Sequence, residues 1–146
     1  MADRITATVA EDGCPIAAAE LSRATSLTWR LQEKRENHRL ETAESIKATV
    51  CLYATADAPQ DGDPLVLRTD VVTGADAAIV KENFTRTCAT EGGALSAAGG
   101  CERAGAMVEG LVATAGRAVE LYLVNADKTT AIKLTPSFPA ILAVVH

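Results

Sequence analysis

Two runs of alternating apolar and polar residues, separated by a turn-forming segment, constrain the fold of this chain more than any other feature. Residues 44–55 (ESIKATVCLYAT) alternate with a period of two, and residues 64–72 (PLVLRTDVV) do the same. The segment DAPQDGDP at residues 57–64 combines two Pro, one Gly and three Asp. These residues supply the restricted φ, the positive φ and the local side-chain hydrogen bonds that a chain reversal requires. The pattern therefore predicts a β-hairpin.

Length and charge narrow the class of protein. A chain of 146 residues fits a single domain spanning residues 1–146, long enough to bury a core without a metal. The net charge of -5 argues against a nucleic-acid partner, which would need a basic surface. Aromatic residues make up only 3% of the chain, so we expect a core of Ala, Val and Leu. The mixed charges of residues 32–39 are interpreted as a solvated helix end.

Four cysteines without CxxC spacing favour disulfides over a zinc site. Their even number allows two disulfides in three connectivities. We favour a bond between Cys88 and Cys101, because the Gly-rich segment between them is flexible enough to close a loop, and this leaves Cys14 to pair with Cys51. The alternative is four buried free thiols in a reducing cytosol.

The chain carries no clear targeting segment. No run approaches the roughly 20 apolar residues of a membrane-spanning helix. The N-terminal MADRITATV lacks the basic start and apolar stretch of a signal peptide, so the chain is either cytosolic or a mature segment with an added Met. The sequon Asn83-Phe84-Thr85 makes Asn83 a candidate glycosylation site, which favours secretion.

The N-terminal third is expected to form a strand and a long helix. Residues 4–9 (RITATV) alternate and are rich in β-branched side chains, which is typical of a strand. Residues 16–34 follow Pro15 and contain good helix formers, so we expect one long helix there. Trp29 lies off the apolar stripe of this helix, and we expect it to pack in the core rather than to be exposed. The stripe is Ala17, Leu21, Ala24, Leu27 and Leu31.

After the hairpin, residues 75–89 predict a second helix, whose buried face would be Ala77, Val80, Phe84 and Cys88. Residues 91–100 are interpreted as a linker inside a disulfide loop, because they lack the lysine and the glycine spacing of a phosphate-binding loop. Residues 102–115 predict a third helix that ends at Gly116. Its Gly105 and Gly110 suggest close approach to another element.

The C-terminal segment alternates again. Residues 117–125 and 129–135 predict a second hairpin, and residues 140–146 predict one more strand. A continuous helix over residues 103–125 is the rival interpretation. The resulting fold class is α+β: a mostly antiparallel sheet of about five or six strands with helices packed on its faces, as in a three-layer α/β/α sandwich.

The sequence lacks the motifs of familiar catalytic and metal sites, so we predict no catalytic, cofactor-binding or metal-binding residue. His38 and His146 stand outside ligand spacings and are interpreted as solvated surface histidines. The serines lie outside GxSxG. Turn formation accounts for Asp57, Asp61 and Asp63, which make only a fragment of a calcium loop.

Four segments of the chain occur in an order found in a known family. A cysteine opens the helical residues 14–27, the predicted strand 44–55 runs into a turn, a second cysteine opens residues 101–110, and the strand 117–125 follows. This order resembles the surface antigens of Eimeria and related coccidian parasites. The chain lacks the cysteines that often finish the last strands of that family, and it is short between residues 31 and 44. The resemblance implies a secreted α/β/α sandwich tied by disulfides, carried on a lipid anchor whose signal has been removed, and used for display or host-cell attachment.

Together these observations predict a non-enzymatic secreted or cell-surface binding protein, a surface antigen stabilised by two disulfides. Its expected partner is a protein or a host-cell surface ligand, and it would meet a membrane only through the removed lipid anchor. The alternative is a small acidic cytosolic adaptor or chaperone-like α+β protein, which would bind a partner protein through a strand edge or helix groove. An enzyme with a spatially assembled site requires a pocket with convergent polar groups.

Overall fold

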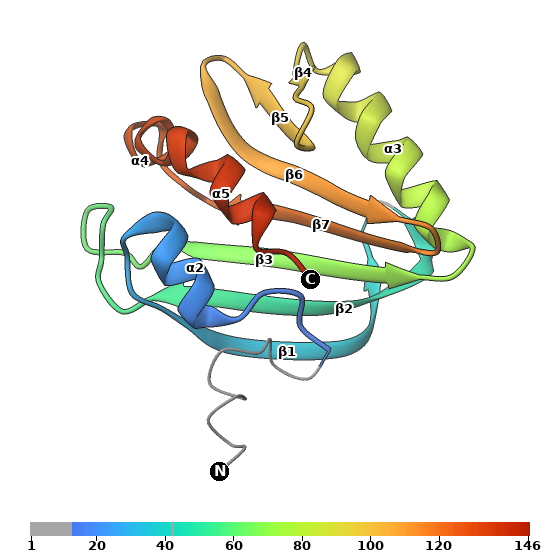
Figure 1. Ribbon diagram of the computed structural model, residues 1–146, viewed down its shortest axis with the longest axis horizontal. Coiled ribbons are helices and arrows are strands. Elements are labelled where there is room, and N and C mark those ends of the chain that lie inside the picture. Colours follow the sequence, from blue (N-terminus) through green and yellow to red (C-terminus); the bar gives the residue numbers. More distant parts are fainter. Residues whose placement is uncertain (1–12, 42) are drawn as a thin grey trace.

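The computed structural model describes residues 13–41 and 43–146. Seven strands form one antiparallel sheet in the order β1-β2-β3-β7-β6-β5-β4, between helices on both faces (Figure 1). In chain order the elements are α2 (Ala18–Thr25), β1 (Trp29–Leu40), β2 (Ala43–Thr55), β3 (Val66–Thr73), α3 (Asp76–Thr90), β4 (Ala94–Leu95), β5 (Gly100–Arg103), β6 (Ala106–Thr114), β7 (Arg117–Val124), α4 (Lys128–Leu134), a 3₁₀ turn (Thr135–Ser137) and α5 (Phe138–Ala143). The fold class is therefore α+β, as the sequence predicts, with seven described strands in place of five or six.

Two meanders make up the sheet. β1, β2 and β3 pair in sequence, and so do β4, β5, β6 and β7. The meanders join where β3 pairs with β7, from Val66 opposite Val124 to Thr73 opposite Arg117. The chain crosses from β3 to the far edge of the sheet through α3. This crossing leaves β3 and β7 as the two central strands.

The strands alternate between two apolar cores. Leu67 and Leu121 point to the core that contains Leu21 of α2 and Phe138 and Ile141 of α5. The side chains at the alternate positions of the strands face the other way. There Val72, Ala118 and Leu111 form a second core with Val80 and Phe84 of α3. This period of two is what a sheet covered on both faces requires. The helices α2, α4 and α5 thus lie on one face and α3 lies on the other.

The predicted hairpin, the predicted second helix and the disulfide pairing are confirmed. β2 and β3 match the two alternating runs, and α3 buries Ala77, Val80, Phe84 and Cys88. Cys14 is bonded to Cys51 and Cys88 to Cys101, and no cysteine is free. Between the end of α3 and the start of β5, residues 91–99 form an exposed to half-buried connection that contains the two exposed residues of β4. The strand predicted for residues 4–9 lies outside the described residues.

The long helix predicted for residues 16–34 is wrong beyond Thr25. Ser26 adopts a left-handed conformation with φ 63° and ends α2. Thr25 Oγ1 accepts hydrogen bonds from Leu27 N and, at 2.7 Å, from Trp29 Nε1, so its hydroxyl closes the helix end. The residues from Trp29 onward form β1, because pairing with β2 overrides their helix propensity. Trp29 is buried in the core, as expected.

The helix predicted for residues 102–115 is also wrong, because that stretch forms the end of β5 and all of β6. Ala104 and Gly105 both have positive φ, the geometry of a tight hairpin turn. Gly110 is indeed a site of close approach: a Cβ there would lie 2.7 Å from Leu142 of α5. Gly116, predicted to stop a helix, instead turns β6 into β7 with φ 78°.

The two C-terminal strands predicted for residues 129–135 and 140–146 are wrong, because α4 (Lys128–Leu134) and α5 (Phe138–Ala143) occupy most of these residues. α4 begins at a cap in which Asp127 Oδ1 accepts a hydrogen bond of 2.8 Å from Thr130 N. α5 packs Phe138, Ile141 and Leu142 onto the sheet. β7 matches the strand predicted for residues 117–125, which rules out the continuous helix as well.

Candidate functional site

A cleft lies between α3, the sheet and the end of β1. It has a volume of about 270 Å³ and adjoins a second hollow of about 230 Å³, with three lining residues in common. We call the two hollows together the acidic cleft. Its lining residues are Leu40, Glu41, Asp70, Val80, Asn83, Phe84, Thr87, Glu109, Glu120 and Tyr122.

The β1–β2 hairpin reaches over the sheet to form one wall of this cleft. We call residues 38–41, at the end of β1, the hairpin tip. The pairing of β1 with β2 shifts register between Arg35 and His38 and again between Arg39 and Leu40, and such irregularities bend a strand. The bent strand places Leu40 in the same apolar core as Val80 and Phe84 of α3.

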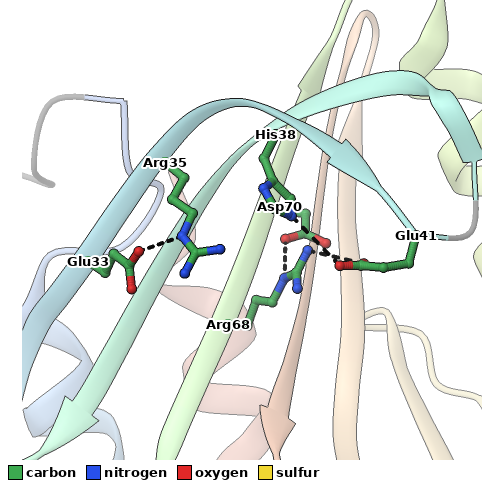
Figure 2. A network of polar contacts seen from close by, with 6 residues as sticks. All are labelled: Glu33, Arg35, His38, Glu41, Arg68 and Asp70. Atoms are coloured by element: carbon green, nitrogen blue, oxygen red, sulfur yellow. Dashed lines mark hydrogen bonds and ion pairs between the residues drawn. The ribbon is translucent and has the colours of Figure 1, made fainter.

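An arginine at the sheet surface ties the hairpin tip to the central strands. Arg68 Nε donates a hydrogen bond of 2.8 Å to Asp70 Oδ1, two residues along β3. Arg68 Nη2 lies 3.5 Å from Glu41 Oε1, and Glu41 Oε2 lies 3.7 Å from His38 Nε2. Figure 2 shows the guanidinium between the carboxyl groups of Asp70 and Glu41, while Glu33 and Arg35 form a separate pair. Arg68 also lies over the Tyr122 ring, 5.8 Å from its centroid.

Two carboxyl groups stand opposite each other on the central strands. Asp70 pairs with Glu120 in the β3–β7 register, and side chains in such positions have Cβ atoms about 5 Å apart. Burial, with the charge of Asp70 added, raises the pKa of Glu120 to about 7, although Arg68 opposes the shift. Burial also raises the pKa of Asp70, although its bond to Arg68 works in the other direction. The pair therefore favours a state with one proton near neutral pH.

The rest of the floor adds further polar groups. Glu109 of β6 stands opposite Tyr122 of β7 and forms an ion pair with Arg103, which also pairs with Glu91. Burial raises the pKa of the Tyr122 hydroxyl. The cleft thus presents four carboxyl groups from four separate segments, beside an apolar wall and the polar side chains of Asn83 and Thr87.

The candidate glycosylation site lies at this cleft. Asn83 sits on α3, where it is half-buried and its Oδ1 accepts a hydrogen bond of 2.6 Å from Arg86 Nη2. The middle residue of the sequon, Phe84, is buried in the core under α3. Glycosylation of Asn83 stays a prediction, and a glycan there would stand at the mouth of the cleft.

The other singled-out polar residues lie apart from one another. His146 Nε2 lies 2.7 Å from Glu20 Oε1, far from the half-buried His38 of the hairpin tip. Asp57, Asp61 and Asp63 are exposed in the loop between β2 and β3, where Asp63 N donates to Gln60 O. Over the described residues, no group of three or more His, Cys, Asp or Glu side chains is placed to hold a metal ion.

Sequence reasoning singled out Val80, Asn83 and Phe84 of the cleft lining, but none of its titratable residues. Arg68, Asp70, Glu120 and Tyr122 occupy the polar positions of alternating strands, and an alternating strand ordinarily turns its polar face to water. The available signal was the second helix, α3, whose apolar face needs a surface to cover. Because α3 covers only part of that face of the sheet, a half-buried polar cleft remains beside it.

Comparisons with protein-family models, curated proteins and solved structures returned no match for this chain. Among the helices of residues 13–41 and 43–146, none is long and apolar enough to cross a membrane. The disulfides and the acidic cleft are therefore the features of the chain that bear on its function.

Proposed function

We propose that the protein is a non-enzymatic extracellular or cell-surface binding and display protein, which engages a basic side chain of a protein partner at the acidic cleft. The observation that supports a binding site here is that four carboxyl groups meet beside an apolar wall. Display and attachment to a host cell belong to the same proposal, and they are supported by the sequence resemblance.

The disulfides support an oxidising compartment. Both bonds are buried, and each ties a peripheral element to the sheet: Cys14 to Cys51 of β2, and Cys88 of α3 to Cys101 of β5. Structural disulfides persist outside the cytosol and are rare inside it. The cytosolic adaptor alternative predicts free thiols, whereas no cysteine is free here.

The compartment is tested by the intact mass of natively produced protein, alkylated with and without prior reduction. We expect no alkylation before reduction and four alkylated cysteines after it. Peptide mapping should then join Cys88 to Cys101. Four thiols that react without reduction would overturn the extracellular assignment.

The lining of the cleft matches a Lys or Arg side chain. Val80, Phe84 and Leu40 offer an apolar wall for an aliphatic stem, and Glu109 and Glu120 offer acceptors for a charged end. The acidic net charge of the chain would also speed the approach of a basic partner. An anionic ligand is disfavoured, because the carboxyl groups of the cleft outnumber its arginines.

Binding is tested by titrating isotope-labelled protein with short Arg- and Lys-containing peptides at pH 8 and following amide shifts by NMR. We expect shifts in α3, β6 and β7 that are absent when the peptides carry citrulline or acetyl-lysine instead. Glu109→Gln and Glu120→Gln should each weaken binding, whereas the exposed Glu102→Gln should not. Shifts that are indifferent to peptide charge, or equal in all variants, would refute the cationic site.

An acid–base enzyme is the second candidate function, and the Asp70–Glu120 pair is the observation that favours it. Paired carboxyl groups that ionise at different pH values are the usual arrangement for a general acid and a general base. Chromogenic glycosides, esters and phosphoesters test this candidate. A turnover that depends on pH and vanishes in Glu120→Gln would establish it in place of simple binding.

A further inference from the structure

The last residues of β6 have a partner strand on one side only. On that side β6 pairs with β7 as far as its last residue. On the other side β5 begins at Gly100, which lies opposite Gly110. The last contact of the β5 side with β6 is a hydrogen bond of 2.9 Å from Leu111 N to Gly99 O. Within the described part of the chain, residues 112–114 therefore have no strand beside them on this side.

The backbone groups of Ala113 point to this open side. The turn between β6 and β7 contains two residues, so the residues that flank it, Thr114 and Arg117, form a hydrogen-bonded pair. The pattern alternates along an antiparallel pair, so Ala113 and Ala118 exchange no hydrogen bonds. The N–H and C=O of Ala113 thus point away from β7, as the N–H of Leu111 does. Ala113 offers one donor and one acceptor to an added strand.

The open edge forms one wall of a groove, and α3 forms the other (Figure 1). Hollows of about 300 Å³ and 640 Å³ adjoin there and have Lys81 and Ala113 in common. We call the two hollows together the edge groove. It is lined by α3 and the turn before it, by residues 95–99 and by residues 111–116. Phe84 is the one residue of α3 that borders both this groove and the acidic cleft.

Residues 95–99 close the groove at one end. Gly99 lies so close to β6 that a Cβ on it would collide with Leu111 O. A strand added at Ala113 can therefore extend toward the β6–β7 turn but not past Leu111. If the added strand is antiparallel to β6, its C-terminal end meets the closed end of the groove. If it is parallel, its N-terminal end does.

Charge distinguishes the two directions. Lys81 is the only charged residue in the lining of the edge groove. Its side chain is exposed and forms no ion pair with the residues that the structure describes. A terminal carboxylate at the closed end would be attracted to Lys81, whereas a terminal ammonium group would be repelled. The lining therefore favours an antiparallel strand that ends in the groove.

The closed end also fits an apolar side chain. Ala113 packs against the core under α3, and a residue directly opposite it on an added strand would present its side chain on the same face. There the groove is lined by Phe84, Leu95 and Leu111. Leu95 is one of the few large apolar side chains left exposed, with 47% of its surface accessible. A large apolar residue at the end of the added strand would cover it.

We propose that the edge groove binds the free C-terminus of a partner protein, which adds to β6 as a short antiparallel strand and ends in a large apolar residue. The terminal carboxylate accepts the N–H of Ala113 and pairs with Lys81. The C=O of Ala113 accepts the N–H of the last residue of the partner. Backbone pairing at a strand edge supplies affinity, while the carboxylate and the last side chain supply specificity. This site does not depend on the acidic cleft, and it selects the opposite charge.

Titration of isotope-labelled protein with short peptides, followed by amide shifts in NMR, tests this site. The probes are acetylated Ser-Thr-Val-Val, Ser-Thr-Val-Leu and Ser-Thr-Val-Phe, each as the free acid and as the C-terminal amide. We expect the free acids to shift the amides of residues 81–85, 95–99 and 111–115. The amides should bind at least about tenfold more weakly, because they lack the charge-assisted hydrogen bond.

Three results on the unaltered chain would overturn the proposal. The first is the absence of shifts with every free acid at about 5 mM. The second is equal affinity for acids and amides, which would show that the groove accepts internal segments rather than a terminus. The third is a set of shifts located away from the edge groove.

Two variants assign the contacts. Lys81→Gln should weaken binding of the free acids about two- to fivefold, whereas Lys133→Gln, at an exposed position of α4 on the other face, should not. Ala113→Pro removes the donor without breaking the β6–β7 ladder, because this N–H points away from β7, and it should weaken binding at least about tenfold. Free-acid affinity that is unchanged in both variants would refute the assigned contacts.

The edge groove and the acidic cleft can be separated by experiment. The probes carry no basic side chain, so Glu109→Gln should leave their binding unchanged while it weakens binding of the cationic peptides. A groove that fails to bind therefore leaves the proposed function standing, and a cleft that fails to bind leaves the groove standing. Free-acid binding that is lost in Glu109→Gln would instead place these peptides in the acidic cleft and refute the groove.

Discussion

The two faces of the sheet bury very different side chains. The face covered by α2, α4 and α5 packs Leu67, Leu121, Phe138 and their neighbours into a core lined almost wholly by apolar groups. The face covered by α3 holds a second apolar core, and beside it the same strands present Arg68, Asp70 and Glu120. Both cores therefore supply stability, but the α3 face gives up some of it to keep titratable groups in a cleft.

The two phenylalanines of the chain test this contrast most directly, because one lies in each core. Phe138 is completely buried, so Phe138→Ala should lower the free energy of unfolding by about 3–5 kcal/mol. Phe84 borders the acidic cleft, where water can enter the space, so Phe84→Ala should cost about 1–3 kcal/mol. Urea denaturation of both variants measures the difference. Equal losses would mean that the α3 face is packed as tightly as the other.

The disulfides allow a second comparison, since each anchors one face. Cys14–Cys51 closes a separation of 37 residues and Cys88–Cys101 one of 13. In the chain-entropy account, replacing both cysteines by Ala should cost about 4 kcal/mol for the first and about 3 kcal/mol for the second. Thermal unfolding of the two double variants gives the order. A larger loss for Cys88–Cys101 would indicate that α3 depends on its bond for docking.

The Asp70–Glu120 pair predicts that the free energy of unfolding depends on pH, and this dependence arises on the face covered by α3. Because the pKa of Glu120 in the folded chain, about 7, lies above the ordinary glutamate value of 4.5, the folded state holds the proton more tightly than the unfolded state does. This stabilisation is complete below pH 4.5 and is lost as the pH rises through 7. At pH 8 Glu120→Gln should be more stable than the unaltered chain by about 1–3 kcal/mol, and at pH 4.5 the two should be alike.

Denaturant unfolding of both proteins from pH 4.5 to pH 8.5 measures this effect. The decisive quantity is the difference between the two curves, since other carboxyl groups change both alike. A difference that does not depend on pH would mean that Glu120 ionises freely in the folded state.

The smallest expected effect concerns a helix cap on the apolar face. Asp127 accepts the N–H of Thr130 at the start of α4, so Asp127→Ala should cost about 1 kcal/mol. Asp127→Asn keeps an acceptor in place and should be nearly neutral. The pair is compared by thermal unfolding at pH 7. A loss as large in the Asn variant would assign the effect to the charge of Asp127 rather than to the cap.

Elements whose signals lie within one segment were predictable from the sequence. Segments whose secondary structure is decided by pairing with a distant strand were not. The β2–β3 hairpin and α3 carry their own signals in alternation, turn residues and apolar spacing. Residues 29–34 and 102–115 contain residues that suit either state, and strand partners distant in the chain resolved them as β. Residues 129–135 alternate like a strand, yet the cap at Asp127 and the sheet beneath them favour a helix.

The sequence by itself predicted the α+β class, the central hairpin and α3, because each depends on residues close together in the chain. It favoured the observed pairing of the cysteines but left the other connectivities and free thiols open. Only the tertiary structure decided the acidic cleft. Its carboxyl groups come from the hairpin tip, β3, β6 and β7, and none is unusual in its own segment. The raised pKa values of Asp70 and Glu120 arise first from burial and, for Glu120, also from the register that sets Asp70 opposite it. Long-range pairing creates both conditions, and no local pattern records them.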